Sequence, residues 1–596
     1  MEKLDYRLRL ATIGTILLCG SVSVFAKPAI RESKTVNQPD GTTVTIRLIG
    51  DEHAHLYLTE DGYPVKYDSR LGYVYALIDE DGARVSSGIT AHDAAYRKPG
   101  ELGLLKPMDS DAIENLLSKN AARKFSVRKS ENNSGEQPVE SKGYGLCETS
   151  FPSTGKQKGL VILVEYQDVR FDSRNSSSYK YTNYTSEENA AHTYWTDLLN
   201  KPGFDGFGSN GSCRDWFLDN SADSEGNSQF MPEFDLFGPV TLPNNMAYYG
   251  GNNYYGDDER AYMMVVDACN LLDDEIDFSQ YDRDGDGKVD NVYIFYAGLG
   301  EADMGGEDTV WPHSWDLRYA DADFMLDGVT IDHYACSNET DNVRKSPDSI
   351  GTFVHEFSHV LGLPDLYTTT YNNAYTPGAY SVLDYGPYNN EGRTPPNYSA
   401  YERWALGWMT PELYGQSGLY ELTNLADTNK AYLVRTEKET EYFLLENRQQ
   451  TGWDAYLPGH GMLIWHIDYV PSIFENNVVN NTPSHQYVDL IEANGKKQER
   501  YAAGHPFPGT SNVTSYTFVS WSKQDCGVSL SDLSEKDGVI SKYVENLNPS
   551  SVSSIGDENI DGKAEYYNLQ GMRIAQPVKG ETTIVRTGTT TRKVIF

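Results

Sequence analysis

The alternation of apolar and polar residues changes character several times along the chain. From residue 27 to about residue 108, short apolar stretches alternate with turn dipeptides, as in QPDGTTVTIRLIG and LTEDGYPVKYD, which predicts β-hairpins. The next segment, SVRKSENNSGEQPVESKGYG (126–145), has almost no large apolar residues and predicts an exposed linker, a natural site of proteolysis. Residues 27–145 are therefore expected to form a β-rich unit followed by a linker.

A continuous apolar run, GLVILVEYQDVRF, begins at Gly159 and is typical of a buried central strand. Helical periodicity follows in AAHTYWTDLLN, in ERAYMMVVDACNLLDDE and in SAYERWALGW, which ends before Pro411. This succession of strand and helix patterns predicts an α/β domain over residues 146–412.

Strand patterns return after residue 412. YELTNL, KAYLVRT, EYFLLENRQ and HGMLIWHIDYV predict a β-sandwich-like domain over residues 413–548. The tail, residues 549–596, contains EYYNLQGMRI, TTIVRT and RKVIF separated by turns, which predicts a compact module of three strands.

Residues 1–26 have the layout of a secretory signal. Arg7 and Arg9 precede the apolar run LATIGTILLCGSVSVFA, and we expect cleavage after Ala26. No later apolar run reaches the roughly 18 residues that a membrane helix requires. The sequence therefore predicts a secreted or cell-surface protein without membrane insertion.

Composition narrows the choice of partners. Fifty basic and 86 acidic side chains give a formal net charge of −36, which repels phosphate backbones and anionic lipid surfaces. Nucleic acid is therefore not expected as a partner. The same acidity suits calcium-bearing extracellular proteins, and it also suits a plain solubilising surface.

The stretch VHEFSHVLGLPDLY, residues 354–367, carries the clearest chemistry. On a helix, His355 and His359 are i and i+4 neighbours, so both imidazoles project from one face and can bind one ion, with Glu356 beside it. A catalytic zinc ion uses three protein ligands and keeps a fourth position for water. The motif therefore predicts a zinc-hydrolase site that needs a third ligand.

Two carboxylates compete for the third position. Gly362 can adopt a left-handed conformation that ends the helix and turns Asp365 back towards the metal. Glu402, in SAYERWALGW, is the alternative, because a glutamate from a downstream helix completes the site of thermolysin-like enzymes. We favour Asp365, since the glycine bend already directs it to the metal.

These residues suggest a mechanism of peptide hydrolysis. Zinc would lower the pKa of its water, and Glu356 would accept the proton during attack on a peptide carbonyl and later protonate the leaving amine. In AYSVLDYGPYNNEG, a tight turn is expected below the site, with Leu383 where metzincins have methionine. Tyr385, two residues later, is a candidate to steady the oxyanion; the alternative is an ordinary core or turn tyrosine.

DRDGDGKVDN, residues 282–291, predicts a second metal site. Its places one, three, five, seven and nine match a calcium loop and hold Asp282, Asp284, Asp286, Lys288 and Asp290, with Gly287 at the sharp bend. The twelfth place carries Tyr293 in place of the usual bidentate glutamate. We therefore expect a structural calcium loop and no switching EF-hand, the alternative being an acidic turn without an ion.

Together, HEFSHVLGLPDLY, DRDGDGKVD followed by VYIFYAGLGEADMGGEDTVWPHSW, and EYFLLENRQQTGWDAYLPGHGMLIWHIDY resemble the secreted immune inhibitor A-like metallopeptidases over residues 27–543. This resemblance implies a metzincin-like zinc endopeptidase made as a zymogen, with the N-terminal unit as an inhibitory propeptide. The blocking residue is undetermined: Cys147 is a candidate thiolate switch, and the alternative is an ordinary buried thiol. The tail resembles C-terminal sorting modules of secreted bacterial proteins.

Two classes of function follow. The first is a secreted zinc endopeptidase that acts on protein or peptide substrates. The second is a surface adhesin or polymer-binding protein on a degenerate protease scaffold, since a fold alone proves no activity. The intact set of His355, Glu356 and His359 favours the enzyme, because a pure binding protein does not need a base beside two ligands.

Overall fold

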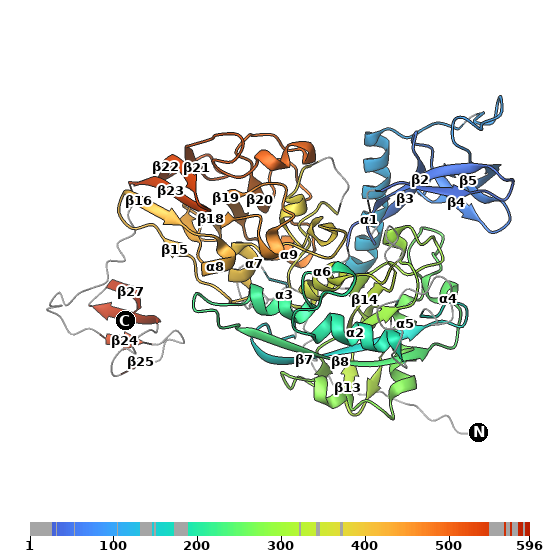
Figure 1. The fold of residues 1–596 in the computed structure, drawn as a ribbon, viewed down its shortest axis with the longest axis horizontal. Coiled ribbons are helices and arrows are strands. Elements are labelled where there is room, and N and C mark those ends of the chain that lie inside the picture. Colours follow the sequence, from blue (N-terminus) through green and yellow to red (C-terminus); the bar gives the residue numbers. More distant parts are fainter. Residues whose placement is uncertain are drawn as a thin grey trace, which may run out of the picture. The chain divides into compact units, whose positions relative to one another are not determined.

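The chain is described here in a computed structural model (Figure 1). The described residues are 27–30, 32–52, 54–103, 105–131, 146–147, 149, 151–171, 181, 189–320, 323–340, 346–369, 374–547, 565–567, 573–574, 582–587 and 590–595. The predicted signal peptide and most of the predicted linker lie outside them. Within the described residues, no helix combines the length and apolar character needed to cross a membrane.

The N-terminal unit contains two antiparallel three-stranded sheets, so the predicted hairpins are present. Their orders are β1-β2-β3 and β4-β5-β6, with the bounds β1 Lys34–Asn37, β2 Thr43–Gly50, β3 His55–Thr59, β4 Val65–Asp68, β5 Gly72–Ile78 and β6 Arg84–Thr90. The sequence interpretation missed helix α1, Ser110–Glu131, and its linker began too early. Ile113, Leu116 and Leu117 have helical spacing and pack on Leu56 and Leu58 of β3.

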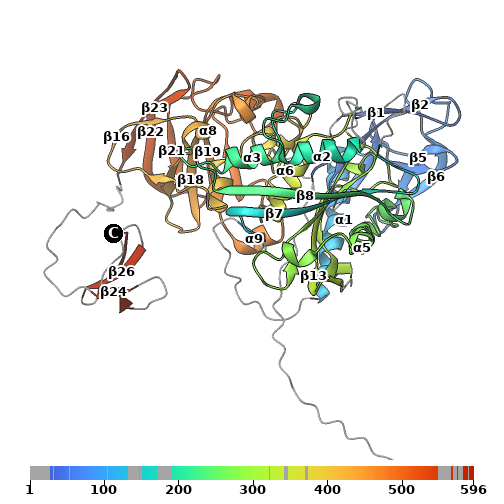
Figure 2. The same ribbon diagram turned by 60° about the horizontal axis from the view of Figure 1, so that its bottom comes forward.

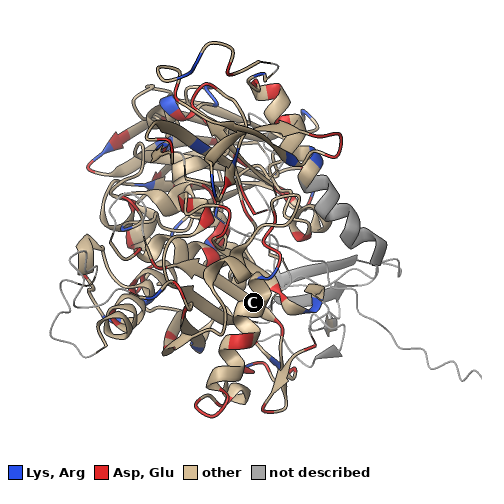
Figure 3. Cartoon of the chain, turned by 90° about the vertical axis from the view of Figure 1, so that its right-hand side faces the viewer, with Lys and Arg blue, Asp and Glu red and all other residues tan. Residues whose placement is uncertain are grey.

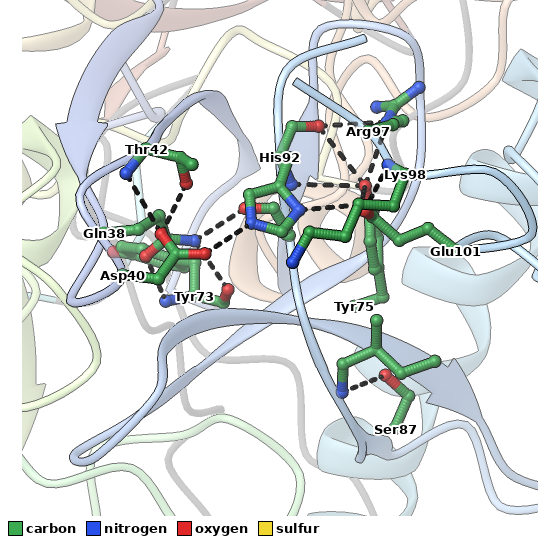
Figure 4. Close-up of polar contacts among 12 residues, drawn as sticks. Gln38, Asp40, Thr42, Tyr73, Tyr75, Ser87, His92, Arg97, Lys98 and Glu101 are labelled. Carbon is green, nitrogen blue, oxygen red and sulfur yellow. Dashed lines mark hydrogen bonds and ion pairs between the residues drawn. The ribbon is translucent and has the colours of Figure 1, made fainter. Parts of the chain in front are cut away.

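A polar network crosses this unit (Figure 4). The Gln38 side chain donates to the carbonyl of Tyr73 at 2.7 Å and accepts from its N–H at 3.0 Å. His92 lies between two carboxylates, with Nε2 2.9 Å from Asp40 and Nδ1 2.8 Å from Glu101. Burial disfavours the imidazolium, but the bonds to both carboxylates outweigh it and raise the pKa of His92 above the usual 6.5.

This raised pKa predicts a pH-dependent N-terminal unit. The protonated imidazole stabilises the folded state fully below about pH 6.5, and its contribution is lost as the pH rises through the folded-state pKa. Hydrogen exchange of β4–β6, corrected for its intrinsic pH dependence, should become severalfold faster between about pH 6 and pH 9. His92→Asn should remove this change. A pH response that is identical in both proteins would contradict the assignment.

A five-stranded mixed sheet forms the centre of the next region. Its order is β11-β14-β10-β7-β8, with the bounds β7 Gly155–Glu165, β8 Phe230–Thr241, β10 Val292–Tyr296, β11 His313–Asp316 and β14 His333–Asn338. Four strands are parallel, and β11 pairs antiparallel with β14 at one edge. The run predicted as a buried strand is β7, which pairs with strands on both sides.

Helices cover both faces of this sheet (Figures 1 and 2), which gives a mixed α/β architecture. On one face, Val161 and Leu163 of β7 share a core with α6, Ile350–Val360. The helices α2, Ala190–Asn200, and α3, Cys213–Asn220, belong to the same core. On the other face, Leu160 and Ile162 pack with α5, Ala261–Leu272. Alternate side chains of β7 therefore pack into two different hydrophobic cores, one on each face of the sheet.

The C-terminal β region consists of two sheets, ordered β15-β17-β18-β19-β20 and β16-β23-β22-β21. Their bounds are β15 Glu412–Leu413, β16 Gly418–Leu422, β17 Tyr432–Arg435, β18 Glu441–Arg448, β19 Gly461–Asp468, β20 Val488–Ile491, β21 Tyr516–Val519, β22 Asp525–Lys536 and β23 Val539–Asn546. Phe443, Ile464 and Leu530 contribute to the core between them. Leu444 and Trp465, on the other side of β18 and β19, join the core that contains α6.

Residues of the EYFLLENRQ block connect the α/β region to the C-terminal β region through buried ion pairs and hydrogen bonds. Arg448, at the end of β18, is fully buried and forms ion pairs with Glu446 at 3.2 Å and with Asp454. It also donates to the carbonyl of Asn397 at 2.8 Å. Glu446 accepts from the N–H of Ala400 at 2.5 Å, at the start of α7, Ala400–Ala405. The motif thus has a structural use at the junction of the two regions.

Residues Asn548–Phe596 form a separate unit. Its sheet has the order β25-β24-β26-β27, with the bounds β24 Glu565–Tyr567, β25 Arg573–Ile574, β26 Thr582–Thr587 and β27 Thr590–Ile595. The described residues of this unit form four strands where three were predicted, because EYYNLQGMRI contains two paired strands.

Acidic residues are distributed over many elements, with fewer basic residues between them (Figure 3). This distribution agrees with the excess of 86 acidic over 50 basic side chains.

Candidate active site

The helix α6 carries the HEFSH segment and is buried along its whole length. It ends in a Schellman motif: the N–H of Gly362 bonds to the carbonyl of His359 at 2.9 Å, and that of Leu363 to Ser358 at 3.0 Å. Gly362 has a φ of +92°, and a Cβ there would lie 2.9 Å from the carbonyl oxygen of Cys147. Only glycine suits this turn, which brings Asp365 back beside the helix.

Three potential metal donors meet at this point. The Nε2 atoms of His355 and His359 are 3.2 Å apart, and Asp365 Oδ1 lies 3.4 Å and 3.3 Å from them, respectively. All three side chains are buried. Nδ1 of His355 bonds to the carbonyl of Val382, and Nδ1 of His359 to that of Leu363, each at 2.7 Å. In a neutral imidazole this arrangement leaves Nε2 as the lone-pair nitrogen.

This donor set fits a zinc ion. Asp365 Oδ1 has no hydrogen-bond donor, while Oδ2 accepts from the side-chain amide of Asn477 at 2.7 Å. With both imidazoles neutral, two lone-pair nitrogens and a carboxylate oxygen therefore face one another, which is a donor set suited to a metal ion. Ligands at 2.0–2.1 Å in a tetrahedral site lie about 3.3 Å apart, so the observed spacing matches that geometry.

Glu402 is engaged elsewhere. It is the third residue of α7 and forms a capping box with Ser399, whose side chain accepts from the N–H of Glu402. Its carboxylate also accepts from the Ser381 hydroxyl at 2.8 Å. The structure therefore brings Asp365, and not Glu402, to the two histidines.

The predicted turn lies against the site. The carbonyl of Leu383 accepts from the N–H of Leu366 at 2.8 Å, and the N–H of Gly386 closes the turn on Ser381 at 2.9 Å. Leu383 is fully buried, as expected for the residue in the methionine place. Tyr385 follows in this turn and is partly exposed.

Glu356 is in hydrogen-bond contact with a residue of the N-terminal unit. The backbone N–H of Lys27 donates to Glu356 Oε1 at 3.0 Å, although the two residues are 329 positions apart. Burial, followed by the charge of Asp365, raises the pKa of Glu356 well above the usual 4.5, while the bond from Lys27 opposes the shift. The thiol of Cys147, the candidate thiolate switch, donates to the carbonyl of Phe474 at 3.3 Å.

The acidic loop at residues 282–290 is organised by its own backbone. Asp282 accepts from the N–H groups of Gly285 and Gly287 at 2.8 Å and 3.0 Å. Carboxylate oxygens of Asp282, Asp284 and Asp290 lie within 4.8 Å of one another, whereas Asp286 is not part of that group and accepts from the N–H of Lys288 at 2.8 Å. Burial, with the charges of neighbouring aspartates, raises the pKa of Asp290 to about 7.

Sequence reasoning missed two participants. Asn477 orients Asp365 from 112 positions downstream, and Lys27 reaches Glu356 from the N-terminal unit. Neither has a local signal, because each acts only through the tertiary fold. Glu402 did have one: the spacing Ser399-x-x-Glu402 is the signature of a capping box.

Residues 149–415 match the family model described as the immune inhibitor A peptidase M6 catalytic domain. The pre-pro-metalloprotease PrtV of Vibrio cholerae serotype O1 is 27% identical over 292 residues, 44% of this chain and 30% of the relative. Immune inhibitor A of Bacillus thuringiensis subsp. alesti is 27% identical over 273 residues, 41% of this chain and 38% of the relative. The match thus spans about a third of each relative.

The cluster of His355, Glu356 and His359 lies within these matched residues, whose family model describes a peptidase catalytic domain. Residues 149–415 are thus similar to a catalytic domain of the immune inhibitor A type, which confirms the resemblance inferred from the sequence motifs.

Proposed function

We propose that the protein is a secreted zinc-dependent endopeptidase with a metzincin-like catalytic domain. The observation that carries the proposal is the cluster of His355 Nε2, His359 Nε2 and Asp365 Oδ1, spaced for a tetrahedral ion. A carboxylate oxygen of the buried Glu356 also lies within 4.8 Å of ring nitrogens of both histidines. A zinc ion at these three ligands supplies a water of lowered pKa and polarises the substrate carbonyl. The ion would be held by two rings that are already oriented through their Nδ1 bonds.

Glu356 is the proton carrier in this mechanism. It accepts a proton from the attacking water and delivers it to the nitrogen of the leaving peptide. The 3.0 Å contact between Glu356 Oε1 and the backbone nitrogen of Lys27 supports this role, because it shows that a main-chain nitrogen can reach the carboxylate that would protonate the leaving amine. Tyr385 remains our candidate for steadying the oxyanion from the turn below the site.

We further propose that the N-terminal unit keeps the enzyme latent. Residues 27–30 lie buried against the site, and the indole N–H of Trp311 donates to the carbonyl of Lys27 at 3.1 Å. Ile30 donates through its N–H to the carbonyl of Ala302 at 3.0 Å, so the segment is held along the catalytic region. The relative named a pre-pro-metalloprotease supports a signal and a pro-segment here as well.

Casein turnover by the full chain, before and after cleavage within residues 126–145 and release of the N-terminal unit, tests this function. We expect little activity before cleavage and strong activity afterwards, which phenanthroline abolishes and added zinc restores. Turnover that survives complete chelation would contradict the metal mechanism. A processed, folded, zinc-loaded protein that cleaves no protein at all would favour the adhesin alternative.

For the acidic loop we propose a structural calcium ion. The support is the cluster of Asp282, Asp284 and Asp290 carboxylates, together with the backbone N–H groups that already fix the loop. Calcium should raise the melting temperature by at least about 3 °C over a sample in EGTA, and Asp284→Asn should reduce the difference. Equal melting temperatures with calcium and EGTA would contradict the site.

A further inference from the structure

Lys27 reaches into the catalytic region with its side chain as well as its backbone. Its ammonium group lies 3.0 Å from Asp303 Oδ2 and 3.1 Å from Thr352 Oγ1, and 5.0 Å from the centre of the Tyr388 ring. Lys27 is 2% exposed and Asp303 4%, so the charged pair is removed from water. Asp303, Thr352 and Tyr388 thus form a cation-binding pocket that offers a carboxylate, a hydroxyl group and an aromatic face.

The pocket is held by its surroundings. The Thr352 hydroxyl donates to Asp348 at 2.9 Å, which leaves its oxygen lone pairs for the lysine ammonium. Asp303 closes a short 3₁₀ turn, Glu301–Asp303, and the next residue, Met304, is buried with a φ of +62°. A left-handed methionine is a strained conformation that the fold maintains.

The direction of the chain identifies the subsite. The nitrogen of Lys27 bonds to Glu356, and the chain then runs away from Glu356 through Pro28, whose carbonyl accepts from the Tyr388 hydroxyl at 2.6 Å. Ile30 continues along Ala302. A cleaved substrate has the same layout: the nitrogen released by hydrolysis belongs to the residue on the C-terminal side of the broken bond, called P1′.

We propose that Asp303, Thr352 and Tyr388 form the P1′ subsite and that the enzyme cleaves on the N-terminal side of lysine. This inference rests on the proposed peptidase function and names its substrate class. An apolar P1′ residue would leave the Asp303 carboxylate buried without its cation, and an acidic residue would add repulsion. When a site pairs its own buried polar group with a group of the substrate, it discriminates strongly against substrates that lack that group. A hydrophobic pocket discriminates much less between substrates that differ by one methylene group.

The test uses the full chain after cleavage in the 126–145 linker. Quenched fluorescent peptides identical except at one position, with lysine, norleucine or glutamate there, are compared by kcat/KM, and mass spectrometry locates the cleaved bond. Lysine should exceed norleucine by about 100-fold, with cleavage before it. Asp303→Asn should lower that ratio at least tenfold, and Thr352→Val about threefold. Asp235→Asn, where the aspartate pairs with the exposed Lys158, is the matched control and should keep the wild-type ratio.

A wild-type enzyme that cleaves before norleucine as well as before lysine, or an unchanged ratio in a folded Asp303→Asn protein, would overturn the subsite. If no peptide is cleaved, the peptidase proposal fails. A binding measurement then tests separately whether the pocket recognises lysine. In the linker-cleaved Glu356→Ala protein, calorimetry compares the tetrapeptide KPAI with its norleucine analogue. Both displace the same N-terminal segment, so the ratio of affinities is meaningful: at least tenfold in favour of lysine supports the pocket, and equal affinities overturn it.

Discussion

Replacing Glu356 by alanine is expected to lower casein turnover by about 1,000-fold or more, because the site then lacks the group that takes the proton from water and returns it to the leaving amine. The effect should fall on kcat, with zinc binding and the melting temperature close to those of the wild type. The reason is that the proposed ligands are His355, His359 and Asp365, whose facing atoms lie 3.2–3.4 Å from one another, and Glu356 lies beside them as the proposed base.

The matched control is Glu233→Ala, since Glu233 is an exposed glutamate on β8. It should leave turnover within about twofold of the wild type. The measurement is initial rate against casein concentration on linker-cleaved protein, with zinc content determined on the same samples. Equal activity of the Glu356→Ala and wild-type proteins would refute the proposed mechanism.

Replacing Asp365 by alanine is expected to remove most of the zinc and with it the activity. The variant leaves two imidazoles for an ion that needs three protein ligands, and Asn477 then has no carboxylate to hold in place. Dialysed protein should retain less than about a tenth of the wild-type zinc content.

Glu402→Ala is the informative comparison. Its carboxylate caps α7 and holds Ser381, so this variant should keep its zinc and lose stability, by about 1 kcal/mol or more. Metal analysis and thermal unfolding of both variants separate the two roles. Full zinc content without Asp365, together with zinc loss in a folded Glu402→Ala protein, would reverse the assignment of the third ligand.

The local parts of the site were predictable from sequence because local geometry decides them. His355 and His359 must share a helix face at a spacing of four, and Gly362 must bend the chain after them, as its φ of +92° shows. The choice between Asp365 and Glu402 was harder, since both are carboxylates that tertiary structure could bring to the metal. In the structure Glu402 caps α7, and the spacing Ser399-x-x-Glu402, which predicts this role, is present in the sequence.

The rest of the site depends on contacts between distant segments. The hydrogen bonds from Lys27 to Glu356 and from Asn477 to Asp365 span 329 and 112 positions in the sequence. Local patterns of apolar and polar residues cannot predict contacts between segments so far apart. The fold shows the same division. The central strand β7 and the helices α2, α5 and α7 follow from apolar periodicity. The helix α1 was missed because the apolar residues near its start, Ile113, Leu116 and Leu117, are followed by a stretch in which polar residues predominate.

The most direct test of this account is the zinc stoichiometry of the folded chain. Protein purified without added metal, then equilibrated with zinc chloride and passed through a desalting column, is analysed by inductively coupled plasma mass spectrometry. We predict one tightly held zinc ion per chain in the wild type and much less in a folded His355→Ala, His359→Ala double variant. A wild-type protein that is folded and retains no zinc after this treatment would contradict the central claim.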